Sequence, residues 1–578
     1  MFLPVNKSEM KKLGWEKPDI IFVSGDTYID SPFIGISIMG KYLVSKGFRV
    51  VVIAQPDITN GKDISEFGEP ELFWGVTAGS IDSMVSNYTA LKKPRKSDDF
   101  TPGGINNRRP DRSSIIYTNH IRQHFKNTKP IILGGIEASL RRIAHYDYWS
   151  DKLRKSILLD AKADYLVYGM GEKTALEIAE TLRSGGNIKN IRGLCYLSNE
   201  PVDGYIELPD WESVVNDKNS FITMFNFFYK NNDPSYSKGL FQKYANRYVV
   251  QNPPQYFLSE REIDEIHSLD FERDVHPEYA KKGKVKALDT IQFSIMTHRG
   301  CYGECNFCAI TVHQGLTIQN RSQKSILDEV EELTRHKNFK GIISDVGGPT
   351  ANMYGFECEK KIEFGSCIKK RCVFPGTCEK LQPDHSAQIE LLKKIREIKG
   401  VKKVFVASGL RYDLIEDDKK YGQKYLENLV KHHVSGQLKI APEHSDPRIL
   451  KLMGKPPADS LYSFRDNFYK YSDQAGKNQF LTYYFIAAHP GCTEKEMNDL
   501  KIISSEKLKI NPEQIQVFTP TPSTYSTLMY YTERDPFTGE KLFVEKNHKG
   551  KEDQKNALLS KNSQYSFRKT KSKYQRRK

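Results

Sequence analysis

Long apolar runs are missing from this chain of 578 residues. No run approaches the roughly 20 apolar residues that a membrane-spanning helix needs, so we expect no contact with a membrane. Residues 1–17 carry charges but no apolar core segment, which predicts that no secretory signal is present. A hydrophobic content of 38% with 28% charged residues is typical of a soluble protein of two or three domains, and we expect it in the cytoplasm.

Cysteines are few, and most of them are clustered. Seven of the nine lie in two short segments, 301–308 and 358–378. Such clusters indicate metal chemistry in a reducing compartment, because a disulfide framework would spread its cysteines along the chain.

Positive charge exceeds negative charge, and the excess is concentrated at one end. The net charge is +15, and the segment 546–578 holds twelve Lys and Arg against Glu552 and Asp553, a net of +10 that leaves +5 for the rest. Because this segment has few apolar residues, we expect a disordered basic tail. It is either a solvated end that aids solubility or an RNA or ribosome contact that weakens with salt.

The segment 299–310 reads RGCYGECNFCAI and places Cys301, Cys305 and Cys308 close together. Three thiolates this near one another can bind one soft metal centre. A structural zinc ion would need a fourth ligand, for which His313 is available, whereas a 4Fe–4S cluster would leave one iron open. Spacing alone leaves both alternatives open. The loop follows the strand-like run 290–297, and α/β barrels carry their chemistry at the carboxyl ends of strands.

The spacing C-x3-C-x2-C with Phe307 before the last cysteine resembles the radical S-adenosylmethionine (radical SAM) superfamily. From about residue 18 to 543 the chain resembles the YgiQ family within it, including HPEY at 276–279, HQG at 313–315 and GGPTANMY at 347–354. The resemblance implies that Cys301, Cys305 and Cys308 hold a 4Fe–4S cluster. It also implies reductive cleavage of S-adenosylmethionine to a 5′-deoxyadenosyl radical, with flavodoxin or ferredoxin as electron donor.

The resemblance further implies a set of residues beside S-adenosylmethionine. Phe307 would lie near the adenine, and Ser408 and Arg411 near the ribose or carboxylate, where a guanidinium can make two parallel bonds. Glu443 follows the fourth strand near the barrel mouth. The segment Gly347, Gly348, Pro349 and Thr350 resembles a Gly-Gly-Glu-Pro edge without its glutamate, so backbone carbonyls or Thr350 would bind the amine.

The order of expected elements predicts an α/β fold. Strands near 19–24, 49–53, 130–135 and 163–169 alternate with helices, which indicates a parallel sheet in a Rossmann-like, cobalamin-binding-type domain at 1–215. The common D-x-H-x-x-G cobalamin motif is absent, so we favour a domain that shapes the substrate site over bound cobalamin. For residues 286–545 we expect a partial (β/α)6 barrel, because six apolar runs in this region predict buried strands. These runs are 290–297, 341–346, 403–408, 437–441, 481–487 and 514–518.

Two further segments complete the predicted organisation. An aromatic-rich connector at 216–285 is interpreted as a core between domains in preference to a surface that stacks bases. An insertion at 355–380 carries a second cysteine group, for which we expect zinc or a second iron–sulfur cluster, with reduced thiols in a mobile loop as the alternative. That group is Cys358, Cys367, Cys372 and Cys378.

Two functions from different classes therefore compete. The first is a radical SAM enzyme whose cofactor carries the chemistry, so that no catalytic acid or base is assigned. The second is an RNA- or ribosome-associated binding protein in which both cysteine groups are structural zinc sites.

Overall fold

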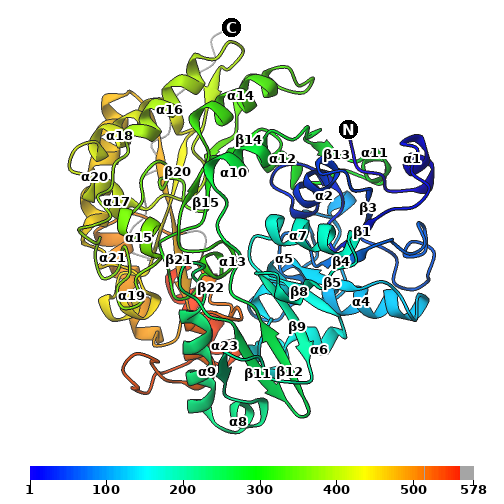
Figure 1. Cartoon of the computed structure of the whole chain (residues 1–578). Coiled ribbons are helices and arrows are strands. Elements are labelled where there is room, and N and C mark those ends of the chain that lie inside the picture. The colour runs from blue at the N-terminus through cyan, green and yellow to red at the C-terminus, as the bar shows by residue number, and fades with distance from the viewer. Residues whose placement is uncertain (513–514, 560–578) are drawn as a thin grey trace.

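The computed structural model describes residues 1–512 and 515–559. In Figure 1 the blue and cyan N-terminal elements and the first green strands form one lobe, and the later green, yellow and orange elements form a second lobe beside it. The short helix α13 (Ile310–Gln314) lies between the lobes and contacts α5 (Gly135–Leu140) of the first.

The N-terminal lobe is built on one sheet of nine strands. Its strand order is β10-β11-β12-β9-β8-β5-β4-β1-β3. The part from β3 to β8 is parallel, and the strands β1, β3, β4, β5 and β8 span Ile20–Ser24, Val50–Ala54, Phe73–Thr77, Ile131–Gly134 and Tyr165–Val167. β1 and β3 are fully buried runs of mostly β-branched residues, as a parallel sheet covered on both faces requires. This confirms the predicted Rossmann-like domain.

Alternate residues of the central strands pack against different helices. Ile20 and Phe22 pack with α2 (Gly35–Ser45) and α7 (Glu172–Arg183). Ile21 and Val23 pack in a second cluster on α4 and α6, which span Ser113–His124 and Ile157–Ala161. The period of two along each strand therefore gives the lobe its three layers.

The aromatic-rich connector contributes to this first lobe. Its strands β11 (Leu240–Tyr244) and β12 (Arg247–Gln251) extend the sheet by pairing with β10 (Ile206–Leu208) and β9 (Leu194–Ser198). Four aromatic side chains of the connector lie in the largest buried cluster, as expected if the connector forms a core between domains. They are Phe221, Phe225, Phe228 and Tyr244.

The second lobe is the predicted partial barrel. β14 pairs in parallel with β18, β17 with β19, and β20 with β21 and then β22, while the bridge between Leu410 and Ile440 joins the two halves. The first predicted strand is shorter than expected, because its beginning forms the helix α12 (Leu288–Ile291). In chain order, β14, β17, β18 and β19 span Ser294–Met296, Ile342–Ile343, Asp345–Gly347 and Lys403–Val404, respectively. β20, β21 and β22 span Gln437–Glu443, Phe480–Ala487 and Ile515–Val517.

The predicted disorder of the basic tail is wrong for its first part. His548–Leu559 form the helix α23, which packs on the barrel through buried Leu558. Lys551 is buried as well, and its Nζ donates to the hydroxyls of Tyr148 and Tyr530, so α23 bridges the two lobes. Residues 560–578 of the predicted tail lie outside the described residues.

No helix in the described ranges is both long and apolar enough to cross a membrane.

Candidate functional site

Beyond the carboxyl end of β14 the chain forms the short strand β15 (His298–Arg299). The three-cysteine loop follows β15 and leads into α13. Cys301 Sγ accepts a bond from the N–H of Gly303 at 3.4 Å and lies 3.4 Å from Thr350 Oγ1. A Cβ on Gly303 would lie 3.1 Å from Cys301 Sγ and 4.0 Å from Cys305 Sγ. The loop therefore wraps closely around a position that faces two of its sulfurs, and only glycine leaves that position free.

Burial controls the protonation of these thiols. It raises the pKa of Cys301, and it raises the pKa of Cys308 to about 12, with added repulsion from the neighbouring Cys305 and Cys301. Thiols in such a setting stay protonated at neutral pH until a metal replaces their protons.

The loop offers three thiols, the number that a 4Fe–4S cluster with one open iron takes, and the expected fourth ligand of a closed zinc site contacts another residue. Among the residues that the structure describes, no three Cys, His, Asp or Glu side chains converge closely enough for a single metal ion. His313, the available fourth zinc ligand, instead has its Nδ1 3.1 Å from Ser139 Oγ in the N-terminal lobe.

Arg411 reaches the cysteine loop from the segment after β19. Its Nη1 lies 3.9 Å from Cys305 Sγ, while Nε and Nη2 bind the carboxylate of Asp413 at 3.1 and 2.5 Å. The fork that was expected to make two parallel bonds to a ligand is thus occupied by Asp413. A single edge of the guanidinium remains toward the sulfurs.

Glu443 ends β20 with a φ of 67°, a left-handed conformation that a non-glycine residue adopts only where its surroundings impose it. Its carboxylate lies 3.7 Å from Lys455 Nζ. Burial raises the pKa of Glu443, whereas Lys455 and Arg411 oppose that rise. Glu443 in turn raises the pKa of Cys308, which places it within electrostatic reach of the cysteine loop.

The glycine segment that begins at the last residue of β18 lies against the same loop. Gly347 pairs with Met296 across the strands, and a Cβ on Gly348 would lie 2.6 Å from the His298 ring. Ser408 is close to Gly347 and donates its hydroxyl to Asp345. Phe307 is partly buried against the barrel core. The structure therefore brings the predicted residues of the second, third and fourth strands to one face, with Pro349 beside them.

A buried chain of hydrogen bonds holds Arg411 and was not found by sequence reasoning. Asn352 accepts from the Arg411 N–H and donates to the Arg411 carbonyl, both at 2.9 Å. The His385 ring lies 3.2 Å from Asn352 and 2.8 Å from the carboxylate of Asp418. Asn352 falls within the GGPTANMY segment, but no sequence signal joins it to His385 and Asp418.

The second cysteine group packs against the first without forming a cage of four. Cys358 is buried, Cys372 and Cys378 are partly buried beside Cys301, and Cys367 is exposed. Burial raises the pKa of Cys372 to about 12, although Lys361 Nζ lies 3.8 Å from its sulfur. Zinc or a second cluster in this group stays a prediction.

Family models match most of the chain. The family described as Radical SAM N-terminal matches residues 2–294, and the Radical SAM superfamily matches residues 295–501. A UPF0313 protein of Fusobacterium nucleatum is 56% identical over 561 residues, which is 97% of this chain and 99% of that one. A UPF0313 protein of Thermotoga maritima is 49% identical over 97% of this chain and 99% of its own length.

Two solved structures are similar at low identity. The radical S-adenosylmethionine methyltransferase TsrM of Kitasatospora setae, with tryptophan substrate and a SAM analog bound, aligns with a TM-score of 0.49 at 14% identity over 87% of this chain and 74% of its own. The cobalamin-dependent S-adenosylmethionine radical enzyme OxsB aligns with a TM-score of 0.49 at 13% identity, over 90% of this chain and 56% of its own.

Proposed function

The chain belongs to the UPF0313 family of radical SAM proteins, and on that premise we propose that it reductively cleaves S-adenosylmethionine at a cluster held by Cys301, Cys305 and Cys308. The observation that carries the proposal is a pair of contacts: Cys301 Sγ lies 3.4 Å from Thr350 Oγ1, and Cys305 Sγ lies 3.9 Å from Arg411 Nη1. These residues follow three different strands, β15, β18 and β19, and their contacts lie on the carboxyl side of those strands. The bound cluster and S-adenosylmethionine would supply the electron transfer and the carbon-centred radical.

Three thiolates are the contribution of the loop to cluster binding. Gly303 lacks a side chain, so its N–H can donate to Cys301 Sγ at 3.4 Å without filling the space between the sulfurs. Such N–H···S bonds and the positive charge of Arg411 stabilise electron density on the sulfurs and tune the cluster potential.

The amino-acid part of S-adenosylmethionine would meet the segment from Gly347 to Thr350 and the free edge of Arg411. Backbone carbonyls after β18 would accept from its amine, and Arg411 Nη1 would donate one bond to its carboxylate. Asp345 fixes the Ser408 hydroxyl beside the same segment, so Ser408 can still accept a bond from a ribose hydroxyl. Phe307 belongs to the loop itself and packs partly buried against the core, so its ring would offer an adenine an apolar surface.

The finer assignment within the superfamily is the YgiQ family, supported by the segments at 276–279, 313–315 and 347–354. A flavodoxin or ferredoxin would reduce the cluster.

The proposal is tested by anaerobic purification, iron and sulfide analysis, and an assay for 5′-deoxyadenosine with dithionite as reductant. The expected result is about four irons for the three-cysteine site and release of 5′-deoxyadenosine. A colourless protein with bound zinc and no cofactor cleavage would instead support the RNA-associated alternative.

A further inference from the structure

A cavity of about 400 Å³ lies between the two lobes. Its floor is formed by the carboxyl ends of β1, β4, β5 and β8, and its roof by Met296, Arg299 and the helix α13. The order β3-β1-β4-β5-β8 makes β1 and β4 the point where the chain reverses direction across the sheet. Ligands of such sheets bind at this point, outside the carboxyl ends of the strands.

The walls of the cavity are mainly apolar. Aliphatic side chains of α2 and α7 line one side, and Met296 and Ile310 line the barrel side. A volume of this size with apolar walls suits an organic molecule of moderate size. Gly134 also lines the cavity, and a Cβ on it would meet no atom within 4 Å, so the space beside it is open.

One end of the cavity carries a buried ion pair with unused hydrogen-bonding groups. Arg299 Nη1 and Glu172 Oε1 are 2.6 Å apart, and the two side chains are only 1% and 3% exposed. Within the described part of the chain, Arg299 Nε, Arg299 Nη2 and Glu172 Oε2 have no hydrogen-bond partner. Buried donors and acceptors of this kind require a partner, and since both residues line the cavity, a ligand at this end of it is the candidate partner.

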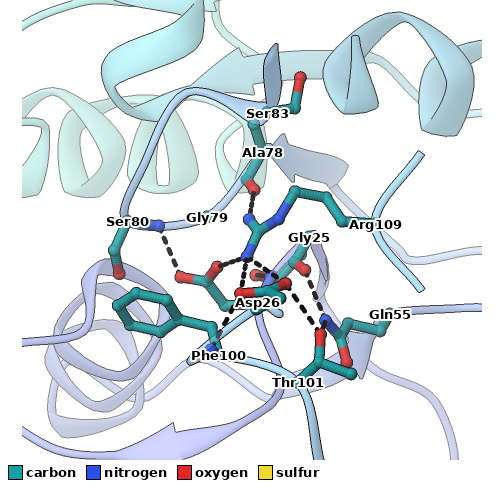
Figure 2. A network of polar contacts seen from close by, with 12 residues as sticks. Gly25, Asp26, Gln55, Ala78, Gly79, Ser80, Ser83, Phe100, Thr101 and Arg109 are labelled. Carbon is teal, nitrogen blue, oxygen red and sulfur yellow. Dashed lines mark hydrogen bonds and ion pairs between the residues drawn. The ribbon is translucent and has the colours of Figure 1, made fainter. Parts of the chain in front are cut away.

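The charges of the cavity wall leave no excess positive charge for an anion. Arg299 is paired with Glu172 at one end. At the sheet end, Figure 2 shows the Asp26 carboxylate between the Ser80 N–H and Arg109, which also binds Asp98. Burial raises the pKa of Asp26, although Arg109 opposes the rise. A ligand ion would therefore lose its hydration without gaining a counter-charge.

The cavity adjoins the cluster loop. Arg299 and Ile310 bracket the three cysteines in sequence, and Met296 pairs with Gly347 of the segment assigned to S-adenosylmethionine. We propose that this cavity is the substrate site and that it takes a neutral, largely apolar small molecule with an amide-like edge that both donates and accepts hydrogen bonds. Its role as a substrate site rests on the proposed function; its ligand preference does not.

The test compares two fluorescent probes of nearly the same shape, anthracene-2-carboxamide and anthracene-2-carboxylate. Each is titrated into the full chain, purified anaerobically. We expect the neutral amide to bind at least tenfold more tightly. In Glu172→Gln the Arg299 charge is uncompensated, so the carboxylate should gain at least tenfold.

A second set of variants locates the binding site. Gly134→Phe should fill the cavity and abolish binding of both probes, and the smaller Gly134→Leu should weaken it if the Phe variant melts early. Gly134→Ala, the matched control, should bind like the wild type. Circular dichroism and thermal melting confirm that each variant is folded.

Three results would overturn the proposal. They are equal or tighter binding of the carboxylate by the wild type, unchanged binding by a folded Gly134→Phe variant, and displacement of the amide by stoichiometric hydroxocobalamin, which would make the cavity a cofactor site. Cleavage of S-adenosylmethionine by the wild type without any probe is measured separately. Its failure would count against the proposed function and leave the binding result standing.

Discussion

The carboxylate of Asp418 is expected to stabilise the fold and to position Arg411. Although burial alone would raise its pKa, hydrogen bonds from the His385 ring, the Tyr421 N–H and the His385 N–H lower the pKa of Asp418 to about 2. A carboxylate whose pKa lies roughly two units below its unfolded value contributes about 2.5 kcal/mol to the free energy of unfolding at pH 7. Asp418→Asn should therefore lower that free energy by about 2 kcal/mol.

The sign of the pH dependence follows from the lowered pKa. The contribution is complete above the unfolded pKa near 4 and is lost as the pH falls through about 2, so the difference between wild type and variant should shrink by roughly half at pH 3. Urea unfolding of the metal-free proteins at pH 7 and pH 3 measures this difference in the free energy of unfolding between the wild type and Asp418→Asn. The control is Asp384→Asn, because Asp384 accepts one bond from the Ser386 N–H in the same loop. Equal stabilities of wild type and Asp418→Asn at pH 7, or a difference that is independent of pH, would refute the reasoning.

Three further predictions concern the loop, Arg411 and the C-terminal helix. Gly303→Ala places a methyl group 3.1 Å from both Cys301 Sγ and Arg411 Nη1, so the iron content after reconstitution should fall at least twofold. The control Gly376→Ala, whose Cβ meets nothing within 4 Å, should bind iron as the wild type does. Arg411→Met removes one charge-assisted bond of about 1.5 kcal/mol, so equilibrium dialysis should show S-adenosylmethionine binding roughly tenfold more weakly, with unchanged affinity counting against the assignment. Burial lowers the pKa of Lys551 to about 8, below its unfolded value, so the unfolded state binds more protons above that pH. The wild type should gain about 1 kcal/mol over Lys551→Met between pH 7 and pH 9, and the absence of this gain in urea titrations would contradict the buried position of the amine.

The sequence predicted the elements whose signal is local. Apolar β-branched runs marked the strands of both lobes, and the spacing of Cys301, Cys305 and Cys308 marked the loop. The N-cap of α14 (Gln323–Thr334) is Ser322, whose side chain accepts from the Ser325 N–H, although Ser325 is a capping residue of the same type three positions later. Capping residues of similar type three positions apart compete, and the tertiary context decides between them.

Interactions over long sequence distances were beyond the reach of the sequence. The helix α23 looked disordered because its composition is basic and polar, but Lys551 gains two hydroxyl partners from residues far away in the chain. The contacts of Arg411 with Asn352, and of His385 with Asp418, depend on which barrel loops become neighbours. The same holds for the Arg299–Glu172 pair, which forms only when the two lobes meet.

The most direct test of the central claim is cofactor cleavage by the wild type and by variants in which Cys301, Cys305 or Cys308 is replaced by alanine. All proteins are reconstituted anaerobically with iron and sulfide, and Cys195→Ala serves as the control because Cys195 is buried in the N-terminal sheet. The account predicts 5′-deoxyadenosine from the wild type and the Cys195 variant and none from the three loop variants. Full cleavage by any loop variant would contradict it.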